Sequence, residues 1–103
     1  MDRIERLKEF LVVNPLDCFV KHALALEYVK IGDDQTARQL FEEVLQTDQN
    51  YIGSYYHLAK LLERLNDADA AIAVYEKGMQ KAKEKGDTHA LSELRSAYED
   101  LTF

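Results

Sequence analysis

The sequence is poor in cysteine, proline, glycine and tryptophan, with one, one, four and none of these residues respectively. A single cysteine rules out an internal disulfide and fits a reducing compartment. Its apolar residues are mostly Leu, Ala, Ile and Val. Together with the scarcity of proline and glycine, this composition favours helices over strands joined by turns. We therefore expect a helical protein that folds without disulfides.

Long apolar runs are also missing from the chain. No run approaches the about 20 apolar residues that a membrane-spanning helix needs. The opening residues, Met-Asp-Arg-Ile-Glu-Arg, do not resemble the start of a signal peptide. We expect a cytoplasmic location and no membrane partner.

Basic residues are outnumbered, with 13 Lys and Arg against 19 Asp and Glu and a formal net charge of −6. Nucleic acids and anionic lipids attract proteins whose positive charge displaces counterions. The excess of acid therefore argues against a nucleic-acid partner. One lysine-rich segment, 77–85, lies near the end of a predicted helix, where cations complement the carbonyl end of the helix dipole. We interpret it as a solvated face.

The chain of 103 residues, 47% of them hydrophobic, is long enough for one small domain with one core. The helical spacing of its apolar residues predicts six helices, over 2–13, 18–31, 34–47, 52–65, 68–84 and 88–101. Asn14-Pro15 ends the first, because proline cannot continue a helix. Gly32, Asn66 and Gly86 supply the left-handed conformation that ends a helix. Nearby aspartates can cap the helices that follow: Asp17, Asp33 or Asp34, Asp67, and Asp87.

Two parts of the chain repeat each other with a period of 34 residues, so that 18–51 aligns with 52–85. The alignment pairs large residues with large and small residues with small, as in Ala25 with Ala59 and Ala37 with Ala71. A small residue allows two helix axes to approach, and larger neighbours then fill the space beside the crossing. Recurrence at this period indicates a repeat architecture.

These residues resemble the tetratricopeptide repeat family, in which a large residue, Leu, a small residue and an aromatic recur at set spacing. The second unit matches the family at Tyr55, Leu58, Ala59, Leu62, Ala71 and Tyr75. The first unit matches it at Leu24, Ala25, Tyr28, Ala37 and Phe41. Lys21 departs from an aromatic position, and Gln49 and Lys83 stand where the family places proline. The resemblance covers nearly the whole chain and implies an all-α fold of antiparallel helix hairpins, about six helices in all.

The resemblance also implies a division of the single domain 1–103. It places an N-terminal capping helix in 1–17, repeats in 18–51 and 52–85, and a C-terminal capping helix in 86–103. Repeat proteins need polar faces at their two ends. We therefore expect the first and last helices to act as those caps.

No arrangement of residues in the sequence indicates catalysis, a cofactor or a metal. Cys18 and His22 share a helix face but supply only two of the four ligands that a structural zinc site needs. Cys18 has no evident base beside it, and the chain contains no Gly-rich phosphate loop and no serine elbow. We predict that the protein is not an enzyme.

The remaining candidate site is the concave groove that the resemblance implies along the first helix of each unit. Carried over by position, the groove residues are Phe19, His22, Leu26, Val29, Lys30, Tyr56, Lys60, Glu63, Arg64, Ser92 and Ser96. The positions at which some family members clamp a peptide carboxylate hold His22, Leu26 and His57 here, so that mode is not supported. The sequence therefore predicts a module that binds a peptide or protein segment of unknown identity.

An alternative prediction uses the same surface. Phe19, Leu26 and Val29 form a group of apolar side chains, and exposed groups of this kind often mark interfaces. They could instead pack against a second copy of the chain, which would make the protein a structural homodimer. The sequence leaves both functions open.

Overall fold

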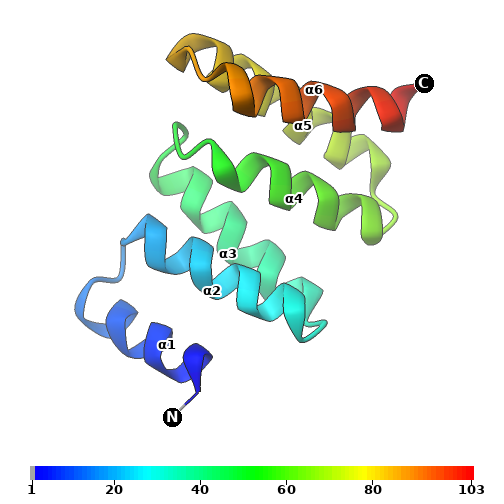
Figure 1. The fold of residues 1–103 in the computed structure, drawn as a ribbon. Helices are drawn as coiled ribbons and strands as arrows, with labels where there is room; N and C mark the ends of the chain where they lie inside the picture. The colour runs from blue at the N-terminus through cyan, green and yellow to red at the C-terminus, as the bar shows by residue number, and fades with distance from the viewer. Residues whose placement is uncertain (1) are drawn as a thin grey trace. The chain divides into compact units, whose positions relative to one another are not determined.

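The computed structural model describes residues 2–103, which form six helices and, within that range, no strand (Figure 1). The helices are α1 (Arg3–Val13), α2 (Cys18–Lys30), α3 (Asp34–Thr47), α4 (Gly53–Arg64), α5 (Ala68–Lys85) and α6 (Thr88–Thr102). Each boundary lies within one residue of its predicted position, and the predicted all-α fold of helix hairpins is confirmed. Among the described residues, no helix is long and apolar enough to cross a membrane.

Aspartate side chains begin five of the six helices. Each carboxylate accepts a hydrogen bond from the backbone N–H three residues later, which satisfies a donor that the helix itself leaves unpaired. The capping residues are Asp2, Asp17, Asp33, Asp67 and Asp87. Helix α4 is the exception, because Ile52 precedes it and forms no side-chain cap. The caps predicted from the sequence are confirmed, with Asp33 rather than Asp34 preceding α3.

Left-handed residues end three of the helices. Gly32, Asn66 and Gly86 have φ values of 83°, 62° and 76°. Asn66 is the only described residue other than glycine with a positive φ. The short polar side chain of asparagine tolerates that conformation better than most other side chains do. The prediction that Gly32 and Asn66 both adopt the left-handed conformation is thereby confirmed.

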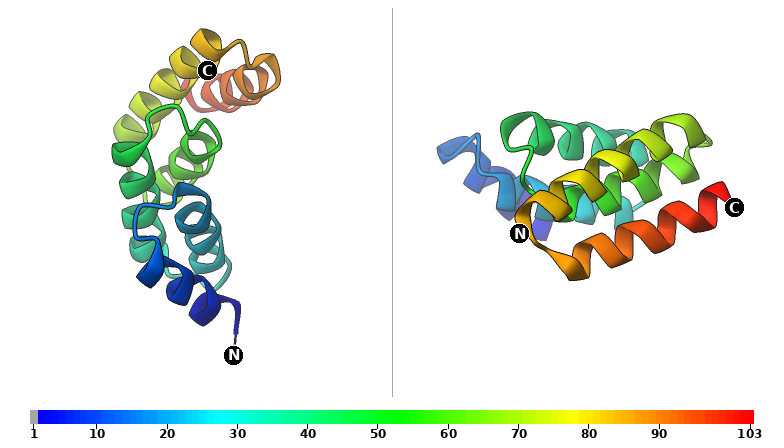
Figure 2. Two further views of the ribbon diagram at one scale, coloured as in Figure 1. Left: turned by 90° about the vertical axis from the view of Figure 1, so that its left-hand side faces the viewer. Right: turned by 90° about the horizontal axis from the view of Figure 1, so that it is seen from above.

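The chain forms two compact units, Met1–Asp48 and Gln49–Phe103. In the first, α2 and α3 form an antiparallel hairpin and α1 packs against α2 (Figure 1). In the second, α5 runs antiparallel to α4 and α6 and packs against both of them, as Figures 1 and 2 show. This order leaves α4 and α6 running in the same direction on one side of α5.

The core of the first unit is built where α2 meets α3. Ala25, Ala37 and Phe41 are fully buried there. Lys21, which departs from the aromatic family position, extends to α3 instead, where its ammonium lies 3.1 Å from a carboxylate oxygen of Glu43. An ion pair therefore connects the two helices at a position where the second unit has an aromatic ring.

That ring in the second unit belongs to Tyr55, which is buried and donates a hydrogen bond of 2.6 Å to the backbone oxygen of Gln49. Tyr55 also packs against Gly78 of α5. A Cβ atom added to Gly78 would lie 2.7 Å from the Tyr55 Cβ atom and 3.2 Å from a methyl group of Leu94. Three helices thus meet at a point where only glycine fits. This role of Gly78 was not predicted from the sequence.

We predict that Gly78→Ala destabilises the protein. Alanine normally stabilises a helix interior by about 1 kcal/mol relative to glycine. Overpacking a tight contact costs about 1–3 kcal/mol, and the atom in the way lies close to the backbone of α4, so it cannot swing aside. In urea unfolding, Gly78→Ala should show a lower free energy of unfolding than the wild type. The exposed control Gln80→Ala should change the free energy of unfolding by no more than about 0.5 kcal/mol. A more stable Gly78→Ala variant would contradict the packing described here.

Candidate functional site

The eleven predicted groove residues lie on three helices that belong to different units. Helix α2 of the first unit carries Phe19, His22, Leu26, Val29 and Lys30, whereas α4 and α6 of the second unit carry the rest. The prediction of one continuous groove through all eleven residues remains a prediction.

The α2 group is less open than the sequence suggested. Phe19 is 71% exposed, but Leu26 and Val29 are half-buried. The His22 ring is half-buried and meets the ring of Phe41 edge-on, with centroids 5.5 Å apart. Lys30 is exposed and its ammonium lies 3.0 Å from the Glu27 carboxylate. Phe19 is therefore the one strongly exposed apolar side chain of this group.

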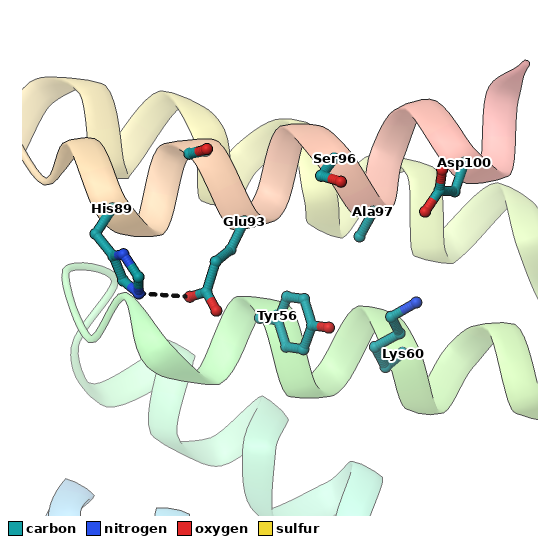
Figure 3. Close-up of a pocket in the computed structure, with 8 residues that line it drawn as sticks. Tyr56, Lys60, His89, Glu93, Ser96, Ala97 and Asp100 are labelled. Atoms are coloured by element: carbon teal, nitrogen blue, oxygen red, sulfur yellow. Dashed lines mark ion pairs between the residues drawn. The ribbon is translucent and has the colours of Figure 1, made fainter.

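The second group surrounds a hollow between α4 and α6, with a volume of about 340 Å³ (Figure 3). It is lined by Tyr56, Lys60, His89, Ser92, Glu93, Ser96, Ala97 and Asp100. Four predicted groove residues, Tyr56, Lys60, Ser92 and Ser96, meet here because α4 and α6 run side by side in the same direction. The structure leaves Glu63 and Arg64 outside the lining. We call this feature the α4–α6 hollow.

The charged side chains of the α4–α6 hollow pair mainly with neighbours on their own helix. The Lys60 ammonium lies 6.0 Å from the centre of the Tyr56 ring and 3.8 Å from a Glu63 carboxylate oxygen. On the opposite wall, the Nε2 atom of His89 lies 3.6 Å from a carboxylate oxygen of Glu93. Asp100, at the far end of α6, forms no ion pair within residues 2–103.

Glu63, predicted from the sequence as a groove residue, also has a structural role. Its carboxylate accepts a short hydrogen bond from the hydroxyl of Tyr75, a fully buried residue of α5. Burial raises the pKa of the Tyr75 hydroxyl far above its usual value, and the bond to Glu63 adds to the rise. Glu63 thus connects α4 to α5 and also holds Lys60 beside the hollow.

A smaller hollow of about 190 Å³ adjoins the first at the N-terminal ends of α4 and α6. It is lined by Ile52, Gly53, Tyr56, His57, Ala90, Glu93 and Leu94. Burial lowers the pKa of His57, so its ring is neutral at pH 7. The two hollows share Tyr56 and Glu93, which places both residues at the centre of this surface.

A group of exposed apolar residues in the first unit was not predicted from the sequence. Phe10, Val12, Val13 and Leu16 are 60–82% exposed at the end of α1 and in the turn that follows it. Only Leu7 of α1 is buried. The exposed surface of α1 is therefore not uniformly polar. A signal was present, since Val12 and Val13 lie outside a stripe that runs through Ile4, Leu7 and Leu11.

Cys18 makes an internal contact rather than a reactive site. Its Sγ atom lies 3.8 Å from the backbone oxygen of Val44, and burial raises the pKa of the thiol. A thiol with a raised pKa is a poor nucleophile at neutral pH. Within residues 2–103, no group of three or more His, Cys, Asp or Glu side chains could hold a metal ion.

Comparison with known proteins agrees with the hairpin architecture. The family model of the tetratricopeptide repeat matches residues 32–98. The chain belongs to the tetratricopeptide repeat family. Its match begins at the turn before α3 and extends into α6. No curated protein matches the chain.

Solved structures of this family resemble the chain closely. A tetratricopeptide repeat domain protein from Salinibacter ruber is 45% identical in its solution structure, with 82% of this chain and 86% of that chain covered and a TM-score of 0.80. In the crystal structure of the same domain protein the identity is 44% and the TM-score is 0.80. The match covers 84% of this chain and 97% of that chain.

Two more distant structures share the fold. The TPR2B-domain:pHsp70 complex of yeast Sti1 is 15% identical, with 96% of this chain and 79% of that chain covered and a TM-score of 0.89. PcrH in complex with the chaperone binding region of PopD is 16% identical, with coverages of 96% and 75% and a TM-score of 0.89. At these identities the likeness shows the fold alone.

We predict that Tyr75→Phe lowers stability at neutral pH by about 1–2 kcal/mol, because the Glu63 carboxylate loses a buried donor. The raised pKa means that this contribution is complete below the ordinary tyrosine pKa of about 10 and is lost as the pH rises beyond it. The free energy of unfolding of the wild type and of Tyr75→Phe should be measured in urea at pH 7, 9, 10.5 and 11. The difference between the two proteins should become smaller at pH 10.5 and 11. A difference that stays constant from pH 7 to 11 would contradict the raised pKa of Tyr75, which burial causes first and the bond to Glu63 second.

Proposed function

We propose that this protein is an interaction module, without catalytic activity, that binds a peptide or protein segment along its α4–α6 surface. The observation that carries the proposal is the α4–α6 hollow, where Tyr56, Lys60, Ser92 and Ser96 surround a space of about 340 Å³. An aromatic ring offers apolar contact area at low entropic cost. The two serine hydroxyls can hydrogen-bond to the backbone of a bound segment.

Family membership supports the same proposal. The Sti1 domain was solved with pHsp70, and PcrH with a region of PopD, so this fold holds protein partners in other chains. We also propose, for the second unit, that Arg64 of α4 takes part in binding and, separately for the first unit, that Phe19, Leu26 and Val29 of α2 contact a partner. We also propose the division into a capping helix in 1–17, repeats in 18–51 and 52–85, and a second capping helix in 86–103.

The proposal predicts where a bound segment perturbs the protein. Fractionated peptides from a cell digest, titrated into ¹⁵N-labelled protein, should shift the amide signals of Tyr56, Lys60, Ser92 and Ser96. Ser96→Arg should abolish these shifts by filling the hollow. Ala73→Arg is the matched control, because it adds the same side chain at an exposed position of α5. Shifts confined to other surfaces, or equal loss in both variants, would refute the site.

A second candidate function is favoured by the exposed apolar side chains of the first unit. Phe10, Val13, Leu16 and Phe19 are each at least 60% exposed. Apolar residues gathered within ten positions of the chain are typical of a surface that another protein covers. A second copy of this chain could supply that cover and make the protein a homodimer.

Homodimer formation predicts a mass that depends on concentration. Light scattering after size exclusion should show wild-type dimers at high concentration, and Phe19→Asp should yield monomers because it places a charge in the interface. Phe19 is a better position for this change than half-buried Leu26, whose substitution would also disturb the fold. Gln35→Asp adds the same charge at an exposed site of α3, at the opposite end of that helix from the contact with Cys18, and serves as the control. A wild type that stays monomeric throughout removes this function.

A further inference from the structure

We propose that the segment bound in the α4–α6 hollow is extended and cationic, with lysine or arginine side chains that pair with Asp100 and Glu93. This inference rests on the proposed function and adds the chemistry of the partner. It uses three features of the hollow: the spacing of side chains along α6, the sign of its available charge, and the face of the Tyr56 ring.

The spacing of side chains along α6 suits an extended chain. Ser92, Ser96 and Asp100 follow one another at intervals of four residues and all line the hollow. Four residues of helix rise about 6 Å, and alternate residues of an extended chain are about 6.6 Å apart. A segment lying along α6 would therefore bring every second residue to one of these three side chains. Two of these contacts are to hydroxyl groups and the third is to a carboxylate.

The charge available to a ligand in the hollow is negative. Asp100 has no ion pair among the described residues, and the ion pair of Glu93 is with His89, whose side chain is 87% exposed. The hollow's one lysine, Lys60, already lies near the Glu63 carboxylate, 3.8 Å away. Two carboxylates thus remain for a partner on the α6 wall. The net charge of −6 on the whole chain attracts a cationic segment in the same sense.

Tyr56 supplies the third feature, an aromatic surface for a cation. In Figure 3 its ring projects from α4 into the space below α6, between Glu93 on one side and Ala97 and Asp100 on the other. A lysine or arginine side chain entering here can lay its alkyl stem on the ring while its charged end reaches either carboxylate. Lys60 already approaches this ring, with its ammonium 6.0 Å from the ring centre, so the partner's charged end pairs with the α6 carboxylates and only its alkyl stem contacts the ring.

The same geometry disfavours an acidic segment. A partner carboxylate near Lys60 would have to displace Glu63, and it would meet Asp100 and Glu93 on the facing wall. Like charges placed together across an interface cost binding free energy. A segment with glutamate in place of lysine should therefore bind more weakly than an uncharged one.

Three synthetic peptides test the proposal. The first is an amidated and acetylated octapeptide of sequence Gly-Ser-Lys-Ala-Lys-Ala-Lys-Gly, and the others carry glutamine or glutamate in place of every lysine. We expect the lysine peptide to shift the amide signals of Tyr56, Ser92 and Ser96, and to bind about fivefold or more tighter than the glutamine peptide, given the strength of exposed ion pairs. The glutamate peptide should bind most weakly, and raising the salt concentration should reduce the differences.

Two protein variants locate the effect. The double variant Asp100→Asn with Glu93→Gln should weaken binding of the lysine peptide about fivefold and leave the glutamine peptide unchanged. The variant Glu84→Gln removes one negative charge from the exposed surface of α5, outside the hollow, and should change neither affinity by more than about 1.5-fold. Thermal unfolding of all variants checks that the fold is intact.

The possible outcomes separate the inference from the proposed function. If the glutamine peptide shifts the same amides with the affinity of the lysine peptide, the hollow binds peptides but the cationic preference is wrong. An equal loss in Glu84→Gln and in the double variant would also overturn it, because the attraction would then come from overall charge. If none of the three peptides shifts signals in the hollow at millimolar concentration, binding at this site fails together with the inference.

Discussion

Close contact between helices at very small residues is the constraint on which both units depend. Ala25 and Ala37 in the first unit, and Ala59 and Ala71 in the second, are fully buried. Where the side chain is only a methyl group, two helices can approach until larger residues beside them fill the remaining space. Gly78 takes this to its limit, because even a methyl group would collide with Tyr55.

This packing also determines what the second unit can present to a partner. Helix α5 packs against α4 and α6 together, so these two helices lie side by side with the same direction. Side chains at intervals of four residues on each helix then face one space. The α4–α6 hollow is therefore a consequence of the hairpin order, and its chemistry follows from the residues that α4 and α6 carry at those positions.

The polar contacts of the structure fall into two kinds. Some hold helices together, as Lys21 with Glu43, Tyr55 with the backbone of Gln49, and Tyr75 with Glu63. Others lie on the surface between residues of one helix, as His89 with Glu93. The first kind removes charged or polar atoms from availability to a partner, whereas the second kind leaves them close to water. Glu63 therefore belongs to the fold, whereas Asp100 forms no ion pair among residues 2–103 and is one of the carboxylates that we propose for recognition.

The sequence by itself determined the helices, their ends and the repeat, because caps, left-handed residues and helical periodicity act over a few neighbouring positions. It also placed Tyr56, Lys60, Ser92 and Ser96 on one surface through the family resemblance. The contacts of Glu63, the tight fit at Gly78, and the exposure of Phe10 were decided only by tertiary structure. Each of these depends on which side chain from another helix lies opposite, and periodicity along one helix carries no information about that neighbour.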